Sequence, residues 1–447
     1  MRARPSLSAL RSGWRWRRMR TGVARSVWVI PTAYIVTSVG AAFLLVQWDV
    51  TSPLQSPLDL SAASASTALA ALGSGMIAFT GFVTSVVLLI VQFGSTQFSP
   101  RFLKWFRRDP TMKHALGTFF ATFLFALVAT AITGRSAAAI VPYRALLGAL
   151  VLSLASIGWF LALISRTSEN LRVAHVAQQV DAQARKVFDD VYPTSHTQVR
   201  AAQAAVHSLD TSTPVQSLRN DGVGAILVAI DRDAFLRLAS DHDAVIELVA
   251  AVGDHVATDG IILHVFGQLP LPARRCQSAL AFADERTIED DPAFAIRLLV
   301  DVAIKALSPA VNDPTTAVQC IHRIEDVLRY ASDKHLSVGV VTDDRGDARV
   351  IIPTPTWEDL VALSLDEIRA FGAGQYQIAR RVRALLEDLI DELPEPRTPV
   401  LLAQMELLDD AVESQFTPLQ RDHALAADRQ GLGLDRKAWA RARERDG

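Results

Sequence analysis

Four long apolar runs before residue 166 constrain the fold of this chain more than any other feature of its sequence. None of them contains Asp, Glu, Lys, Arg or His, and they lie at Val27–Trp48, Thr67–Phe93, Ala115–Thr133 and Ala145–Ile164. A bilayer core about 30 Å thick needs roughly 20 apolar residues in a helix, and a charge at mid-helix costs roughly 2.5–3.5 kcal/mol on insertion scales. Buried helices of a soluble core rarely form such runs in succession, so the pattern predicts four transmembrane helices.

The basic residues around these runs predict the orientation of the chain. They gather before the first run and after the second, at Arg11, Arg15, Arg17, Arg18, Arg20, Arg25, Arg101, Lys104, Arg107, Arg108 and Lys113. The loop after the first run has no basic residue, and the loop after the third has only Arg135 and Arg144. Because Lys and Arg are enriched in cytoplasmic loops, we expect a multi-pass protein of the inner (plasma) membrane with both termini in the cytoplasm.

The remainder of the chain has the composition of a globular domain. We expect a membrane protein with an N-terminal four-helix transmembrane bundle, followed by a cytoplasmic α+β domain that has a small β-subdomain and a helical C-terminal part. The expected segments are a basic tail (1–26), the transmembrane bundle (27–165), a helical stalk and linker (166–215), the β-subdomain (216–270), a helical signature region (271–335), C-terminal α/β packing elements (336–417) and a charged tail (418–447).

Charge and cysteine content exclude several classes of protein. The net charge is -2, and the basic residues crowd beside the apolar runs instead of forming a nucleic-acid-binding patch. Cys276 and Cys320 are far apart and belong to no CxxC pair, which excludes a disulfide framework. No zinc-ligand spacing or calcium loop is present, so we expect no metal and no cofactor.

The second apolar run carries small side chains at helical spacing. Ala70, Ser74, Ala78, Gly81 and Ser85 recur every three or four residues, and Gln92 continues that side of the helix. Such a stripe favours close helix–helix packing within the bundle, or the lining of a pore in a homo-oligomer. The absence of ionisable groups from the runs weighs against a proton-coupled pump but allows passive conduction.

Short β-type runs and amphipathic helices follow. The sequence predicts strands at Ala225–Ile230, Val245–Val249 and Ile261–Phe266, and two more in VGVVT and ARVIIP, joined by an Asp-rich turn. Helices are predicted at Trp357–Phe371, Tyr376–Leu393 and Pro399–Glu413.

The densest polar motif is DERTIEDDPAFAIRLLVDVAIKALSPAVNDPTTA. Pro292 suits the first turn of one helix, and Asp313-Pro314 suits the N-cap and first position of the next. The polar residues allow two interpretations: structural ion pairs and caps, or a binding site for an unknown ligand. The candidates for that site are Arg286, Asp290, Arg297, Asp301, Asn312 and Asp313.

Two stretches resemble the signature regions of a bacterial family of predicted membrane proteins, the domain-of-unknown-function family numbered 2254. They are SGMIAFTGFVTSVVLLIVQFGSTQFSPRFL and RTIEDDPAFAIRLLVDVAIKALSPAVNDPTTA, and the resemblance covers about Trp28 to Leu393. It implies a membrane location and this architecture. It implies no activity, substrate or catalytic residue.

The functional expectation therefore comes from the residues alone. The chain has no P-loop, no GxGxxG after a strand, no HExxH and no GxSxG elbow, so we expect that it is not an enzyme. One hypothesis is an oligomeric passive ion channel or pore regulated by its cytoplasmic domain. The alternative is a membrane-anchored cytoplasmic sensor or scaffold that binds a small ligand or a protein partner.

Overall fold

The structure is a computed structural model that describes residues 28–54, 60–97, 109–134, 141–170, 172–192, 213–336 and 339–432. The chain divides into two compact units, Met1–Arg172 and Val173–Gly447, which we call the membrane unit and the C-terminal unit. The predicted basic tail (1–26), most of the predicted linker (193–212) and the end of the predicted charged tail (433–447) lie outside the described residues.

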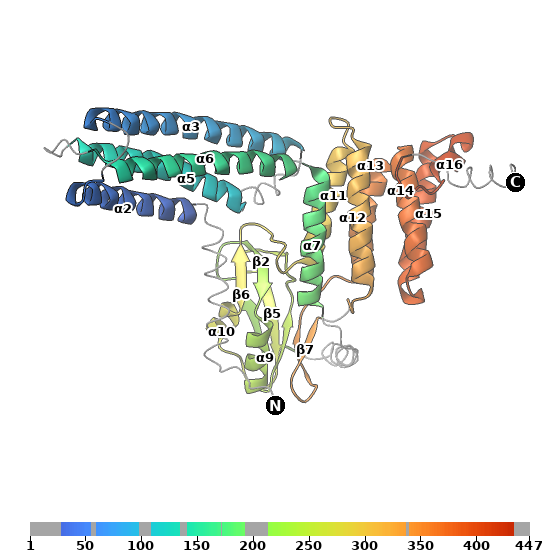
Figure 1. Cartoon of the computed structure of the whole chain (residues 1–447). Coiled ribbons are helices and arrows are strands. Elements are labelled where there is room, and N and C mark those ends of the chain that lie inside the picture. Colours follow the sequence, from blue (N-terminus) through green and yellow to red (C-terminus); the bar gives the residue numbers. More distant parts are fainter. Residues whose placement is uncertain are drawn as a thin grey trace. The chain divides into compact units, whose positions relative to one another are not determined.

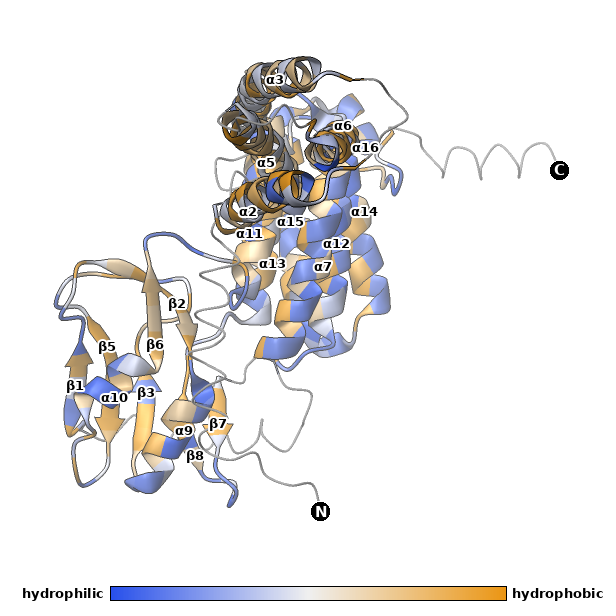
Figure 2. Ribbon diagram, turned by 60° about the vertical axis from the view of Figure 1, so that its left-hand side comes forward, coloured by the Kyte–Doolittle hydropathy of each residue, from blue (hydrophilic) through white to orange (hydrophobic). Residues whose placement is uncertain are grey.

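The membrane unit contains four helices long and apolar enough to cross a bilayer (Figure 1). They are α2 (Val29–Thr51), α3 (Ala62–Gln97), α5 (Pro110–Thr133) and α6 (Tyr143–Asn170). The prediction of four membrane spans is confirmed, and their apolar outward surfaces place the chain in contact with the lipid bilayer. Figure 2 shows the hydrophobic colouring of these helices.

Helix α5 is the centre of the membrane unit, because α2, α3 and α6 all pack against it. Small and aromatic side chains alternate on its buried surface, among them Phe119, Phe125 and Ala126. One polar contact joins α5 to α6 in the apolar interior: the hydroxyl oxygens of Thr122 and Ser156 are 2.9 Å apart. Such interhelical hydrogen bonds add of the order of 1 kcal/mol in membranes.

An ion pair joins the end of α2 to the start of α6. Asp49, only 1% exposed, accepts hydrogen bonds from the backbone N–H groups of Arg144 (3.0 Å) and Ala145 (3.3 Å) and from the Arg144 guanidinium (2.9 Å). A carboxylate is favourable there because the first N–H groups of a helix have no intrahelical partner. Asp49 therefore caps α6 from a neighbouring helix.

Most helices of the C-terminal unit pack together in a bundle. They are α7 (Val173–Val191), α11 (Pro292–Ala306), α12 (Pro314–Ser332), α13 (Trp357–Gly372), α14 (Tyr376–Glu392), α15 (Thr398–Gln415) and α16 (Pro418–Ala424), with a short 3-10 turn, η2 (Glu395–Arg397). Helix α7 buries Val180, Val187 and Phe188 against α11 and α12. This part of the expected stalk is therefore a packed helix of the unit, because its apolar stripe finds a partner surface.

The β-strands of this unit form two sheets, with strand orders β1-β5-β3-β8-β7 and β4-β2-β6. The strands are β1 (Gln216–Arg219), β2 (Ala225–Ile230), β3 (Val245–Leu248), β4 (His255–Val256), β5 (Ile261–Phe266), β6 (Leu280–Ala283), β7 (Val340–Thr342) and β8 (Ala348–Ile351), with helices α9 (Arg232–Asp241) and α10 (Ala273–Ser278) beside them. Strand β8 pairs in parallel with β3, Val350 opposite Ile246. The predicted strands are all present, and the predicted fold class is confirmed.

The first part of the predicted charged tail, up to residue 432, is folded in the structure. Helix α16 buries Ala424, and beyond it the Arg429 guanidinium donates to Asp388 on α14 at 2.8 Å. The side chain of Arg380 also donates to the carbonyl of His423. These contacts attach the segment to the helical bundle.

Replacing Asp49 with Ala removes the acceptor of two backbone N–H groups and of the Arg144 guanidinium. We expect the free energy of unfolding in detergent to fall by about 3 kcal/mol, as when one partner of a buried pair is lost. Thr51→Ala is the control, because its exposed hydroxyl bonds only to carbonyls of its own helix. Thermal unfolding of the purified proteins measures both, and equal midpoints for the wild type and Asp49→Ala would contradict this role.

Candidate functional site

The stripe of small residues on α3 lies on the face that points away from the rest of the membrane unit. The opposite face packs against the bundle through Ala65, Leu69, Thr80 and Val83, each at most 3% exposed. The predicted residues on the outward face are all exposed: Ser74, Ala78, Gly81, Ser85 and Gln92. A Cβ atom added at Gly81 would meet nothing within 4 Å. The stripe therefore does not take part in helix packing among the described residues of a single chain.

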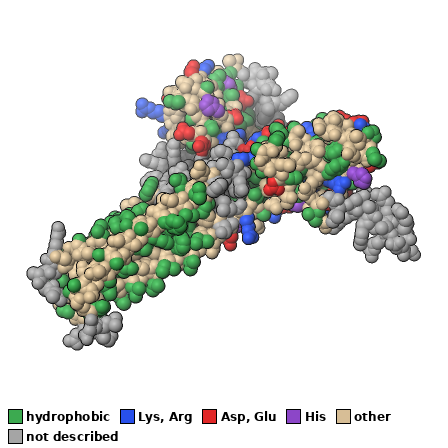
Figure 3. All heavy atoms as spheres, turned by 90° about the horizontal axis from the view of Figure 1, so that it is seen from above, with side chains coloured by type: hydrophobic (Ala, Val, Ile, Leu, Met, Phe, Trp, Pro, Cys, Tyr) green, Lys and Arg blue, Asp and Glu red, His purple; other side chains and the backbone are tan. Residues whose placement is uncertain are grey.

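The outward faces of the other spans carry large side chains. Exposed aliphatic and aromatic residues on α2 and α6 include Val36, Phe43, Leu44, Leu147, Leu150, Val151, Leu154, Ile157 and Leu161. On α3, Ile77 and Phe82 flank the stripe, and Leu88, 67% exposed, lies between Ser85 and Gln92. Figure 3 shows how hydrophobic side chains cover the membrane helices. Shorter series of exposed small residues also occur on α2, at Ala33, Thr37 and Gly40, and on α6, at Ala155, Gly158 and Ala162, and the stripe on α3 is the longest of the three.

The two serine hydroxyls of the stripe are satisfied within the helix. Ser74 donates to the carbonyl of Ala70 and Ser85 to that of Gly81, both at 2.9 Å. Their oxygen lone pairs still point outward and can accept hydrogen bonds from water. From Ala70 to Gln92 the helix rises about 33 Å, close to the bilayer core thickness of about 30 Å. The face can therefore extend across the whole membrane.

The predicted polar cluster of the C-terminal unit is divided between different parts of α11. At its start, Arg286 donates to Asp291 at 2.7 and 3.0 Å, and Asp291 also accepts from the N–H of Phe294 at 3.0 Å. Burial raises the pKa of the Asp291 carboxyl, and the Arg286 guanidinium opposes that rise. The guanidinium fills the space where a Cβ of Gly253 would lie, so only glycine fits there. Asp290 is exposed beside this pair.

Arg297 lies along the side of α11 and binds two carboxylates. It donates to Asp301 at 2.6 Å and, through Nη2, to Glu367 of α13 at 3.0 Å. The hydrogen bond from Arg297 lowers the pKa of Glu367. Arg297 therefore joins α11 to α13, and Glu367 is the partner that the sequence did not reveal.

Asn312 and Asp313 lie beyond the other end of α11, which is about 22 Å long. Asp313 caps α12 by accepting from the N–H and the hydroxyl of Thr316, at 3.1 and 2.6 Å. Asn312 has a φ of 48°, in the left-handed region that Asn tolerates. The six predicted residues thus lie in three separate places: before the start of α11, along its side and beyond its end. No group of three or more His, Cys, Asp and Glu suited to a metal ion occurs within the described ranges.

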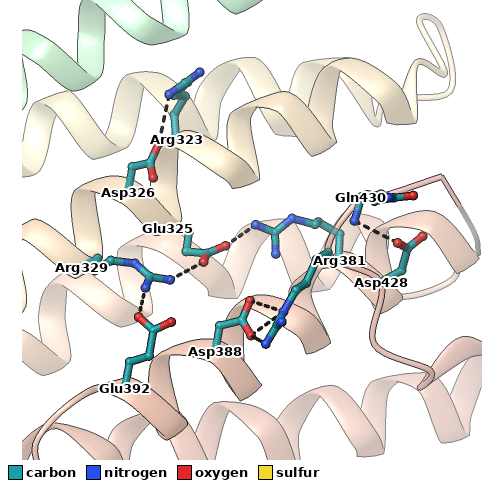
Figure 4. A network of polar contacts seen from close by, with 10 residues as sticks. Arg323, Glu325, Asp326, Arg329, Arg381, Asp388, Glu392, Asp428 and Gln430 are labelled. Carbon is teal, nitrogen blue, oxygen red and sulfur yellow. Dashed lines mark hydrogen bonds and ion pairs between the residues drawn. The ribbon is translucent and has the colours of Figure 1, made fainter. Parts of the chain in front are cut away.

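A second polar network, which the sequence did not reveal, joins α12, α14 and the segment after α16 (Figure 4). Arg381, 3% exposed, donates to Glu325, which also accepts from Arg329 at 2.6 Å. Asp388 accepts from Arg429 at 2.8 and 3.0 Å. The Nε and Nη1 atoms of Arg381 have no hydrogen-bond partner within the part of the chain that the structure describes. Arg381 lies three residues after Ile378 and therefore on the apolar face of α14. A cation at such a position was the sequence signal that could have revealed this network.

The comparisons with known proteins place this architecture in a family. The model of the family described as "Predicted membrane protein (DUF2254)" matches residues 24–388. The chain belongs to the DUF2254 family. An uncharacterized protein of Mycobacterium tuberculosis (strain H37Rv), Rv1290c, and one of Mycobacterium bovis, Mb1321c, are each 26% identical to it over 404 residues, which cover 88% of this chain and 77% of theirs. No solved structure matches the chain.

The predicted signatures of the DUF2254 family coincide with features described above. One contains the outward face of α3, and the other contains α11 with its connection to α12. The predicted family membership is confirmed. Membership in this family agrees with a membrane location and does not indicate an activity.

Acidification should loosen the network around α12. Burial, and after it the charge of Arg381, lowers the pKa of His322 below its ordinary value of about 6.5. Because the pKa of His322 is lower in the folded than in the unfolded state, its neutral imidazole stabilises the fold above about pH 6.5. This stabilisation is lost as the pH falls through the folded-state pKa of His322. We expect faster amide exchange of α12 peptides at pH 5 than at pH 7.5 after correction for intrinsic rates.

His322→Gln should reduce that pH dependence, because the substituted side chain does not titrate. His264→Gln, on strand β5, is the matched control and should leave the exchange of α12 unchanged. An equal pH dependence of α12 exchange in the wild type and in His322→Gln would contradict the assignment.

Proposed function

We propose that this protein forms a homo-oligomer in the membrane in which the outward faces of α3 surround an axis and line a passive ion-conducting path. The observation that supports this is the outward position of Ser74, Ala78, Gly81 and Ser85. Small residues allow α3 helices of neighbouring copies to approach closely, and hydroxyl oxygens can replace part of an ion's hydration. The proposal gives the chain no catalytic role.

The chemistry of α3 favours passive conduction over pumping. Its span from Ala62 to Ile90 contains no ionisable side chain, and proton relays or charged selectivity rings need such groups. Leu88 continues the stripe towards Gln92 and would form an apolar ring in an oligomer. Apolar constrictions gate by excluding water, so Leu88 is the natural closed point of such a path.

The C-terminal unit supplies a regulator in this proposal. Its helices are joined by ion pairs such as Arg297–Glu367 and Arg381–Glu325, which favour movement as one body. It follows α6 along the chain after residues 171 and 172, so a displacement of the unit can be transmitted to the membrane helices. We place this unit and both termini on the cytoplasmic side from the distribution of basic residues.

Ion flux into liposomes that contain the purified full-length protein tests the proposal. Gly81→Leu adds a bulky side chain to the lining, and we expect the flux of monovalent ions to change at least tenfold without loss of membrane insertion. Gly158→Leu, at an equally open position on α6, is the matched control and should leave the flux unchanged. Equal flux in Gly81→Leu and the wild type, or no flux in any of several salts and under an osmotic step, would contradict the pore.

A further inference from the structure

Helices α7 and α12 run parallel, and their contacts fix the register between them. Arg185 donates to the carbonyl of Asp326 at 3.5 Å, and Tyr330 donates to Asp189 at 2.6 Å. Both pairs are 141 residues apart in the sequence. The first residue of α7, Val173, is therefore level with Pro314, the first residue of α12. One end of the C-terminal unit contains both.

Two connections share that end of the unit (Figure 1). The loop between α11 and α12 lies beside the end of α13, because a Cβ at Gly372 would be 3.1 Å from Leu307. The start of α14 lies beside the end of α15, since the rings of Tyr376 and Phe416 are 4.6 Å apart. We call this end, formed by the start of α7, the loop 307–313 and the turn 371–376, the α7-start end.

The α7-start end exposes apolar side chains at the tips of its connections. Phe371 is 59% exposed, Val311 44% and Tyr376 37%. Connections on the surface of a soluble domain usually carry polar residues at such tips, and clustered exposed apolar groups mark a surface that meets a partner. The sequence context supports a lipid partner, because Tyr and other aromatic residues are favoured where hydrocarbon meets headgroups.

The covalent chain limits how far this end can lie from the bilayer. The candidate span of α6 ends at Thr167, and its helix continues to Asn170, so only residues 171 and 172 precede Val173. Three helical steps from Thr167 to Asn170 and three fully extended steps from Asn170 to Val173 span about 15 Å at most. Because the bilayer interface beside the hydrocarbon core is itself several ångströms thick, the start of α7 is tethered close to it.

We propose that the α7-start end of the C-terminal unit rests on the same bilayer that α6 crosses, with Phe371 and Val311 inserted among the lipid headgroups. The unit then has two attachments to the membrane, the covalent one through α6 and an apolar one through its loops. The contact is apolar, so high salt leaves it intact. This inference does not depend on conduction by α3.

Site-directed spin labelling of the full-length protein in phosphatidylcholine liposomes tests the proposal. A nitroxide is attached at Phe371→Cys or Val311→Cys, and its collision rates with O2 and with a water-soluble nickel chelate are measured. The native Cys276 and Cys320 are at most 1% exposed and give little background. Leu402→Cys is the matched control, since it is an exposed apolar position near the start of α15, away from this end.

The proposal predicts an O2-to-nickel collision ratio at residues 371 and 311 at least threefold above that at residue 402, unchanged in 1 M salt. Equal ratios at residues 371 and 402 would overturn it. Spin–spin broadening at residue 371 that disappears on dilution with unlabelled protein would also overturn it, because a second copy and not lipid would then cover this end.

Discussion

The bilayer core offers no water to peptide groups, and this constraint underlies the whole membrane unit. Each span must be a helix, and a chain of four helices with α5 in the middle leaves one outward face on each of the other three. On α2 and α6 those faces carry large side chains that suit lipid, with shorter series of small residues between them. On α3 the series of small residues and hydroxyls is the longest, and in the proposed oligomer it meets the same face of neighbouring copies and water.

Ion pairs organise the helical part of the C-terminal unit. Arg286 binds Asp291, the N-cap of α11, Arg297 joins α11 to α13, and Arg381 joins α14 to α12. The Arg381–Glu325 pair is the buried one among them, and loss of one partner of a buried pair costs roughly 3–5 kcal/mol. These pairs therefore fix how the helices align, and the unit can act as one body on whatever it regulates.

Local patterns were sufficient to predict most elements of the fold. Charge-free runs identified the four spans, and Asp313 before Pro314 identified the start of α12. The pairing of β3 with β8 and the packing of α7 on α12 could not be predicted, because they join segments about a hundred residues or more apart. Periodicity likewise located the stripe on α3 but not the direction it faces, which depends on the packing of Leu69 and Val83 against the bundle.

In the proposed oligomer, the small-residue face of α3 meets water inside the membrane. A charged methanethiosulfonate reagent reacts with thiolates, which form only where water is present. Its reaction with Ala78→Cys in membranes tests this contact with water, and Leu154→Cys on α6 is the lipid-facing control. We expect rapid modification of Ala78→Cys and none of Leu154→Cys. Val223→Cys, at a position of the C-terminal unit that is 87% exposed, is the positive control. If it reacts while neither Ala78→Cys nor Leu154→Cys does, α3 faces lipid or protein, which rules out a water-lined face.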